Sequence, residues 1–316
     1  FLFLIFVVIG VVGMEVSGVT DLRSTSPNMI EKLPMSFPEM ELNSNSIDHS
    51  EIPGDIVEVP PSPMPAGYWP EIHSKHFLYG YPIGTPHTND LIIRDIYAMS
   101  NNDETKFADW VAYRLDEKSI TGESVRDRKW TEDPWLAENE TLEPDDYKDA
   151  NAELKTDRGH QAPLASFKGT ETWHETNYLS NITPQKASLN QGPWVRLEEA
   201  VRDLVEKRGD DPVFIMTGPY FEDETLLLPQ ADEEHRIPSG YWKIVSITNG
   251  DGEIDESAAF LFEQDTVRST DYLDRIVSIR EIELCTGLDF FSDLDDDQED
   301  EIESKINTRW AERNLK

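Results

Sequence analysis

The most informative part of this sequence runs from Asp157 to Pro163 and reads Asp-Arg-Gly-His-Gln-Ala-Pro. Asn190 comes thirty residues after His160, and Glu198 comes eight residues after Asn190. A histidine can take up a proton near neutral pH. An amide oxygen can bind a hard cation such as Mg²⁺, and an arginine can bind a phosphate. Together these residue types predict a site that holds one metal ion and a phosphodiester.

The motifs around this site follow one another in a recognisable order. Asp157-Arg-Gly-His160 precedes Asn177-Tyr-Leu-Ser-Asn-Ile-Thr-Pro-Gln185, which precedes Leu189-Asn-Gln-Gly-Pro-Trp194. This set resembles the DNA/RNA non-specific endonucleases, the ββα-metal (His-Me finger) nucleases typified by the Serratia-type nuclease and by endonuclease G. The resemblance extends from about Tyr97 to Leu288. Asp-Arg-Gly-His alone would be weak support, whereas several motifs in the family's order are strong support.

Short runs of β-branched and aromatic residues, separated by turn residues such as those of 249–252, predict strands. These runs cover residues 77–81, 92–99, 110–115, 213–217, 241–247 and 258–262. Strands interspersed with helices indicate a mixed α+β domain. The resemblance sharpens this prediction to a central antiparallel sheet flanked by helices, with a ββα-metal motif.

Two stretches have the pattern of helices. Between Leu189 and Arg208 apolar residues recur at spacings of three and four. The second helix covers Ile279 to Cys285, where Ser278 and Glu281 have the form of a capping box and Gly287 is placed to end the helix.

The resemblance implies a role for each polar residue of the site. His160 would be the general base, with an ordinary pKa of about 6.5. Arg158 and Arg128 would contact the phosphate and the charge that develops on it, although Arg126 is close enough to exchange roles with Arg128. Asn181 would orient the histidine or contact a phosphate. On local sequence alone, a role as a turn residue at the end of a strand is equally well supported.

The metal prediction also depends on the resemblance. Asn190 would be the direct ligand of Mg²⁺, or of Mn²⁺ in its place, and Glu198 would act catalytically through metal-bound water. On local sequence alone, Asn190 would be a helix cap. Glu198 would then form an ordinary surface pair with Arg202. As part of the site, Arg202 is predicted to bind substrate. Asp157 is expected to brace the loop.

The implied reaction is hydrolysis of internal phosphodiester bonds of DNA and RNA to products with 5′ phosphates. Because the predicted groups address phosphate and metal, cleavage independent of base sequence is expected. Two alternatives stay open: a DNA-selective nuclease of the same fold, and an acidic surface-anchored binding protein with little catalysis.

Charge argues against a nucleic-acid partner at first sight. The chain has 28 basic and 63 acidic residues, a net charge of −35. However, more than half of the Lys and Arg residues lie between 106 and 208, the segment that holds the predicted site. A bound divalent cation would add positive charge there. Composition alone favours an acidic protein without nucleic-acid partners, and the motifs outweigh it.

The N-terminal part is expected to direct export. Residues 1–14 are apolar, so residues 1–18 predict a signal peptide or an N-terminal membrane anchor. Residues 19–66 predict a disordered linker rich in Pro, Ser and Asn. The catalytic domain would cover 67–316. The protein would be secreted, periplasmic or anchored through residues 1–14, and a homodimer stays open.

Other features predict no function of their own. The acidic segment from Asp293 to Glu303 imitates an EF-hand loop without its glycine and final glutamate, so a solvated surface is expected. Trp130 and Trp194 are expected in the core. Cys285 is expected to pack or to be incidental.

Overall fold

The computed structural model describes residues 75–123, 128–222 and 226–316. The predictions for residues 1–66, and the alternative role of Arg126, lie outside these residues. Within the described part of the chain, no helix is long and apolar enough to cross a membrane.

A seven-stranded sheet forms the centre of the folded domain, with every neighbouring pair antiparallel. In spatial order its strands are β1 (Asp90–Ile93), β2 (Ala98–Asn101), β3 (Ala108–Leu115), β6 (Val213–Tyr220), β7 (Gly240–Thr248), β8 (Ile254–Glu263) and β9 (Ile276–Val277). The predicted strands 110–115, 213–217, 241–247 and 258–262 are confirmed.

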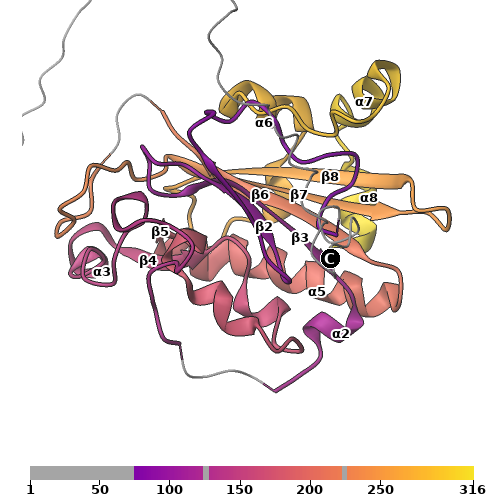
Figure 1. The fold of residues 1–316 in the computed structure, drawn as a ribbon. Helices are drawn as coiled ribbons and strands as arrows, with labels where there is room; N and C mark the ends of the chain where they lie inside the picture. The colour runs from indigo at the N-terminus through magenta and orange to yellow at the C-terminus, as the bar shows by residue number, and fades with distance from the viewer. Residues whose placement is uncertain (1–74, 124–127, 223–225) are drawn as a thin grey trace, which may run out of the picture. The chain divides into compact units, whose positions relative to one another are not determined.

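Helices cover both faces of this sheet (Figure 1). On one face lie α2 (Glu117–Ile120) and α5 (Val195–Arg208); on the other lie α6 (Ile279–Thr286) and α7 (Asp296–Glu303). The last helix, α8 (Thr308–Asn314), packs with the α5 side through Trp310 and Ala311. The mixed α+β prediction is therefore confirmed.

Strand β7 shows how the two layers form a core. All nine of its residues are buried, as expected for a strand with packed helices on both faces. Tyr241 and Val245 point to the cluster that includes Leu197 and Val201 of α5. Trp242 and Ile244 point to the cluster that includes Ile282 of α6.

A separate two-stranded hairpin pairs β4 (Thr156–His160) with β5 (Ile182–Lys186). It lies near α3 (Ala150–Leu154) at one end of the domain (Figure 1). Gln264 attaches it to the large sheet, because its side chain accepts from the amide of Lys186 at 2.7 Å and donates to the carbonyl of Pro184 at 3.0 Å. The hairpin and the following helix α5 form the predicted ββα arrangement.

The remaining elements are short helical turns. They are α4 (Ala187–Leu189), the π-turn η5 (Asn190–Trp194) and the 3₁₀ turns η1 (Glu138–Glu140), η2 (Leu164–Ser166), η3 (Trp173–Asn177), η4 (Leu179–Asn181) and η6 (Tyr272–Arg275). The α6 capping box is confirmed: Ser278 accepts from the Glu281 amide, and the Glu281 side chain accepts from the Ser278 amide. Gly287 ends α6 with a left-handed backbone.

Three sequence predictions need correction. Residues 77–81 do not form a strand, because Tyr79 and Gly80 have positive φ angles of 53° and 90°. The predicted strand 92–99 is two strands, because the chain reverses at a turn closed by the Arg94 amide and the Tyr97 carbonyl. The predicted helix 189–208 is interrupted at η5.

Candidate active site

A hollow of about 380 Å³ lies beside strand β4. Its walls come from the hairpin, from α3, from the start of the interrupted helix and from the segment around Trp130. The lining residues are Arg128, Trp130, Tyr147, Ala150, Asn151, Thr156, Asp157, Arg158, Asn190 and Gln191. Three predicted site residues, Arg128, Arg158 and Asn190, are therefore brought together from distant parts of the sequence.

His160 lies at the end of β4, against this wall. Its ring centroid is 5.3 Å from that of Trp130, and its Nε2 atom is 3.2 Å from Oδ1 of Asn177. An amide oxygen can only accept, so Nε2 carries the proton and Nδ1 keeps its lone pair. This hydrogen bond therefore fixes the tautomer in which Nδ1 is the basic nitrogen.

Burial lowers the pKa of His160 to about 4, although the hydrogen bond that Nε2 donates to Asn177 acts in the opposite direction. This value corrects the ordinary pKa of about 6.5 assumed from the sequence. At neutral pH the imidazole is therefore uncharged, which is the state that a general base requires.

Gly159 allows the two strands of the hairpin to pack closely behind His160. A Cβ atom at this position would lie 2.6 Å from Oε1 of Gln185, whose side chain is buried. Any larger residue would have to displace Gln185. The glycine of the Asp-Arg-Gly-His motif therefore has a packing reason.

Asn181 does not contact the His160 side chain. It is fully buried, its Oδ1 accepts from the Ala162 amide at 2.8 Å, and its Nδ2 donates to the carbonyls of Ala162 and Thr176. These bonds hold the chain just after His160. The predicted orienting or phosphate-binding role needs correction: Asn177, in the same motif, makes the contact with the histidine.

The interruption at η5 places Asn190 at the pocket. Pro193 has no amide hydrogen, so the regular helical bond at its position cannot form. Gly192 takes non-helical angles (φ −117°, ψ −118°) inside this turn. A Cβ atom on Gly192 would lie 2.9 Å from the Cα of Arg268. The Gly-Pro pair therefore separates the turn of Asn190 from the regular helix α5.

The side chain of Asn190 fits a hard metal ion. Its Nδ2 donates to Oδ2 of Asp157 at 3.0 Å, and its Oδ1 has no hydrogen-bond partner among the described residues. Gln191 also donates to Asp157, at 2.7 Å, but its own oxygen accepts from Arg268. Mg²⁺ prefers oxygen ligands and retains several waters. Asn190 thus offers the available amide oxygen, and Asp157 braces it.

Two arginines face the pocket from different segments. Arg158 donates to the carbonyl of Pro144 at 3.1 Å, and its guanidinium lies 5.7 Å from the Trp130 ring centroid and 5.2 Å from that of Tyr147. Arg128 is exposed. Trp130 is partly buried: it packs against the core cluster that includes Phe107 and Leu179 and also lines the pocket, so its predicted place in the core is confirmed in part.

A buried ion pair holds the wall that carries Trp130. Arg94 pairs with Asp133, and Ser180 donates to the same carboxylate at 2.5 Å. Nearby, the amide of Leu179 donates to the carbonyl of Thr131 at 2.9 Å. These contacts connect the segment after Trp130 to the turn that follows Asn177. Trp130 and Asn177, the two residues that contact the His160 ring, are therefore held in place by the same set of contacts.

Glu198 and Arg202 do not line the pocket. Burial raises the pKa of Glu198, whereas Lys243 and Arg202 act in the opposite direction. Lys243 of β7 is buried, with its Nζ 4.3 Å from the ring centroid of Trp194 and 3.5 Å from the Tyr113 hydroxyl. The structure therefore places Glu198 in a charged cluster between α5 and the sheet. Trp194 is in the core, as predicted.

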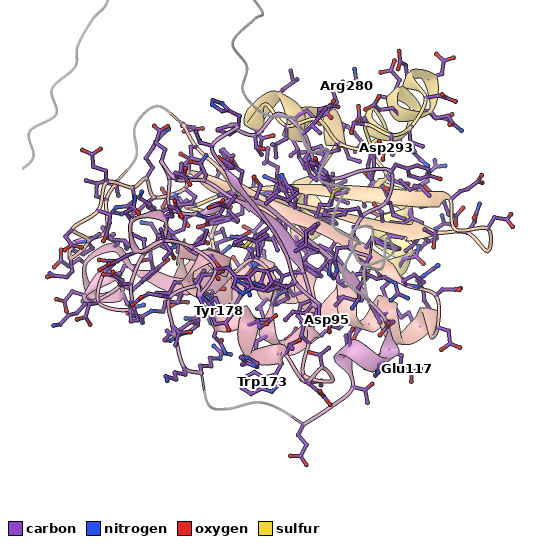
Figure 2. The ribbon with its side chains drawn as sticks, in the orientation of Figure 1. Asp95, Glu117, Trp173, Tyr178, Arg280 and Asp293 are labelled. Carbon is purple, nitrogen blue, oxygen red and sulfur yellow. The ribbon has the colours of Figure 1, made fainter. Side chains whose placement is uncertain are left out.

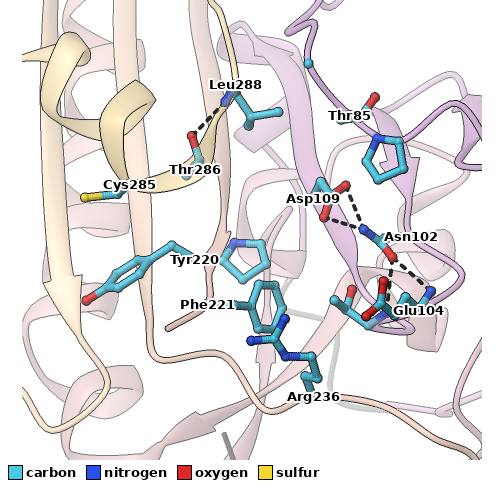
Figure 3. Close-up of a pocket in the computed structure, with 14 residues that line it drawn as sticks. Thr85, Asn102, Glu104, Asp109, Tyr220, Phe221, Arg236, Cys285, Thr286 and Leu288 are labelled. Carbon is cyan, nitrogen blue, oxygen red and sulfur yellow. Dashed lines mark hydrogen bonds between the residues drawn. The ribbon is translucent and has the colours of Figure 1, made fainter. Parts of the chain in front are cut away.

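A second cavity, of about 240 Å³, lies between the ends of β3 and β6 and the segment after α6 (Figure 3). Asp109 accepts there from Asn102, and Arg236 lies over the Phe221 ring at 5.4 Å. None of the predicted site residues lines this cavity. Cys285 lies at its rim and is exposed, so it does not pack in the core.

Comparison with known proteins finds a matching family and several similar chains. The model of the family described as DNA/RNA non-specific endonuclease matches residues 73–297. A nuclease of Serratia marcescens is 45% identical over 226 residues, which cover 72% of this chain and 84% of the relative. A nuclease of Nostoc sp. is 30% identical over 248 residues, covering 74% and 86%. Human mitochondrial endonuclease G is 27% identical over 222 residues, covering 67% and 72%.

A solved structure of an EndoG/EndoGI complex, which concerns the inhibition of EndoG, is similar with a TM-score of 0.60. It shares 21% sequence identity and covers 72% of this chain and 94% of its own, so it supports the fold alone. The family match spans more than half of the sequence, and the Serratia relative is 45% identical over 72% of this chain. These two matches show that the chain belongs to the DNA/RNA non-specific endonuclease family and is an endonuclease.

Proposed function

We propose that this endonuclease uses Mg²⁺ to hydrolyse internal phosphodiester bonds of both DNA and RNA, with His160 as the general base. The observation that carries this proposal is the neutral His160, held by Asn177 beside a pocket that contains Asn190 and two arginines. A base, a hard-metal ligand and phosphate-binding groups are the parts that metal-assisted phosphodiester hydrolysis requires.

His160 would take the proton from the attacking water. Its Nδ1 is the free basic atom because Nε2 is bonded to Asn177. A partly buried, uncharged imidazole is ready to accept a proton at neutral pH, and the Asn177 oxygen would stabilise the imidazolium that forms. Trp130 lies against the imidazole ring and limits its rotation.

Asn190 would hold the metal through its Oδ1, with Asp157 orienting the amide from behind. When bound, the cation would polarise the phosphate and stabilise the departing 3′ oxygen. Mn²⁺ has the same preference for oxygen ligands and could replace Mg²⁺. Glu198 would support this site from its place beside Lys243 at the start of α5, and would reach the metal only through water.

Arg128 and Arg158 would bind the phosphate being cleaved. Arg158 is held between two aromatic rings and one carbonyl, so its guanidinium is oriented before substrate arrives. Arg128 is exposed and reaches the pocket from its rim. Arg202 does not line the pocket, and its charge acts on Glu198, so it would support that carboxylate rather than bind substrate.

The same residues explain why the enzyme would accept both DNA and RNA. The pocket presents charged groups and amides for phosphate and metal, and these groups do not distinguish base edges. Both sugars are therefore expected to be cleaved, with 5′ phosphates on the products. We also propose that the protein is exported, because of the apolar residues 1–14.

Digestion of a supercoiled plasmid and of a single-stranded RNA, each with Mg²⁺ and with EDTA, tests this function. We expect cleavage of both substrates with Mg²⁺, none with EDTA, and 5′-phosphate ends that a ligase accepts. Cleavage of DNA alone would favour the DNA-selective alternative. Cleavage that continues in EDTA would contradict the metal requirement.

A further inference from the structure

Carboxylates gather between α6 and α7, the two helices that cover the face of the sheet opposite α5 (Figure 1). One oxygen each of Glu283, Asp289 and Glu303 lies within 4.8 Å of the other two. Glu283 belongs to α6, Glu303 is the last residue of α7, and Asp289 lies on the segment between these helices. In Figure 2, Arg280 marks this end of the domain, across the sheet from Tyr178.

Glu303 is the unusual member of this cluster. Only 2% of it is exposed, yet its Oε1 has no hydrogen-bond partner among the described residues. Its other oxygen accepts from Arg280 at 3.0 Å, and Arg280 also donates to Asp300 at 2.6 Å. A buried carboxylate oxygen without a partner is costly. One arginine, shared in this way, does not neutralise three converging carboxylates.

The arrangement of the oxygens suits a cation. The Phe290 amide donates to Oε1 of Glu283 at 3.1 Å and holds that side chain in place. Ca²⁺ binds oxygen ligands at about 2.3–2.6 Å, so two oxygens on one ion are at most about 5 Å apart. The three oxygens, each within 4.8 Å of the other two, are therefore close enough to share one ion. We propose that Glu283, Asp289 and Glu303 bind a divalent cation of the Ca²⁺ type, which ties α6 to α7.

The donor set favours Ca²⁺ over other metals. The three converging side chains offer only oxygen, whereas zinc sites mostly use nitrogen and sulfur. Mg²⁺ requires near-octahedral geometry and keeps its waters, whereas Ca²⁺ accepts irregular sets of six to eight oxygens, including bidentate carboxylates. The cation would be structural, because none of these residues lines the pocket beside β4. The site is therefore independent of the proposed catalytic metal.

A shared proton is the competing explanation for the cluster. Burial, together with the neighbouring Glu283, raises the pKa of Glu303 to about 8. A protonated Glu303 would donate to another carboxylate and would need no cation. The two explanations differ in their response to added Ca²⁺.

Thermal unfolding and calorimetric titration of the full chain, freed of metal with EDTA, distinguish them. We expect CaCl₂ at ten times its Kd to raise Tm by roughly 3 °C or more. Glu303→Gln should abolish this shift and the binding heat. Glu301→Gln, an exposed residue of the same helix with the same change of charge, should retain both. Asp289→Asn should weaken Ca²⁺ binding at least ~10-fold, and decides the matter if Glu303→Gln does not fold.

Three results would overturn the proposal. The parent protein could show neither heat nor a Tm shift with CaCl₂, which would leave the shared proton as the explanation. Glu303→Gln and Glu301→Gln could respond to CaCl₂ alike. Asn190→Ala could lose the Tm shift, which would assign the Ca²⁺ effect to the catalytic pocket. Retention of the shift by Asn190→Ala, even if that variant is inactive, supports a separate site.

Discussion

The Nε2 atom of His160 lies 3.2 Å from Oδ1 of Asn177, a residue that is almost completely buried. Asn177 cannot move without disturbing the turn that carries it, so the imidazole has one orientation and one tautomer. The contact joins the end of β4 to the last residue of η3. The orientation of the proposed base therefore depends on a side chain 17 residues away in the sequence.

Asn177→Ala should lower kcat by roughly 10- to 100-fold, which is the usual loss when the partner that orients a functional histidine is removed. KM should change little, because Asn177 does not line the pocket. Steady-state plasmid cleavage at saturating Mg²⁺ measures both parameters.

Asn181→Ala is the matched control for this variant. Its amide makes three internal hydrogen bonds, so its removal should mainly lower Tm. Normal kcat in Asn177→Ala, together with a large kcat loss in Asn181→Ala at unchanged Tm, would return the orienting role to Asn181.

The rate should be insensitive to mildly acidic pH. A general base must be uncharged, and His160 has its pKa lowered to about 4 by burial. The value of kcat/KM should therefore stay nearly constant from pH 7 to about pH 5 and be half-maximal near pH 4, in proportion to the neutral fraction. Initial rates across this range, with circular dichroism at each pH to check the fold, measure the profile. A half-maximal rate near pH 6.5 would show an imidazole with an ordinary pKa.

The sequence predicted the layered architecture well because strands such as β7 and helices such as α5 carry strong apolar patterns. It did not predict the break before α5. Apolar spacing continues through Trp194 and Leu197, as in one unbroken helix, whereas the backbone angles of Gly192 show the kink. The local signal was present in Gly192-Pro193, which cannot continue a regular helix without a lost hydrogen bond.

The sequence predicted which types of residue form the site, but it did not predict every contact between them. Asn177 and Asn181 stand in one motif, and a sequence does not show which amide turns toward the histidine. Glu198 looked like a surface or metal-facing carboxylate because Lys243, whose charge acts on it, comes from a distant strand. Long-range burial of this kind leaves no local pattern.

Asn190→Ala should raise the Mg²⁺ concentration for half-maximal rate by at least ~10-fold, because it removes the proposed direct ligand. Titration of the initial rate with MgCl₂ measures this concentration. Gln191→Ala is the matched control, since Gln191 donates to the same Asp157 oxygen but has its own oxygen bonded to Arg268. It should leave the Mg²⁺ requirement nearly unchanged.

The Glu198→Gln variant should be tested in the same titration of the initial rate with MgCl₂. It should raise the Mg²⁺ requirement less than Asn190→Ala, because Glu198 lies away from the pocket beside Lys243. The opposite order of effects would mean that Glu198 is the direct ligand.

The rate should tolerate salt better than that of a nuclease with a basic surface. A net charge of −35 repels nucleic acid at long range, while Arg128, Arg158 and the metal attract it within the pocket. Salt screens the distant repulsion more strongly, because the Debye length is about 8 Å near 0.15 M. Initial rates against NaCl at saturating Mg²⁺ should be flat or pass through a maximum. A steep fall from the lowest salt upward, as counterion release gives, would show that the acidic surface does not govern binding.

The most direct test of the proposed mechanism is the turnover of His160→Ala on plasmid DNA and on RNA at saturating Mg²⁺. Loss of a general base should lower kcat by at least ~100-fold on both substrates. Because the His160 side chain is only partly buried, Tm should change little. Near-normal cleavage of either substrate by the folded variant would contradict the assignment of His160 as the base.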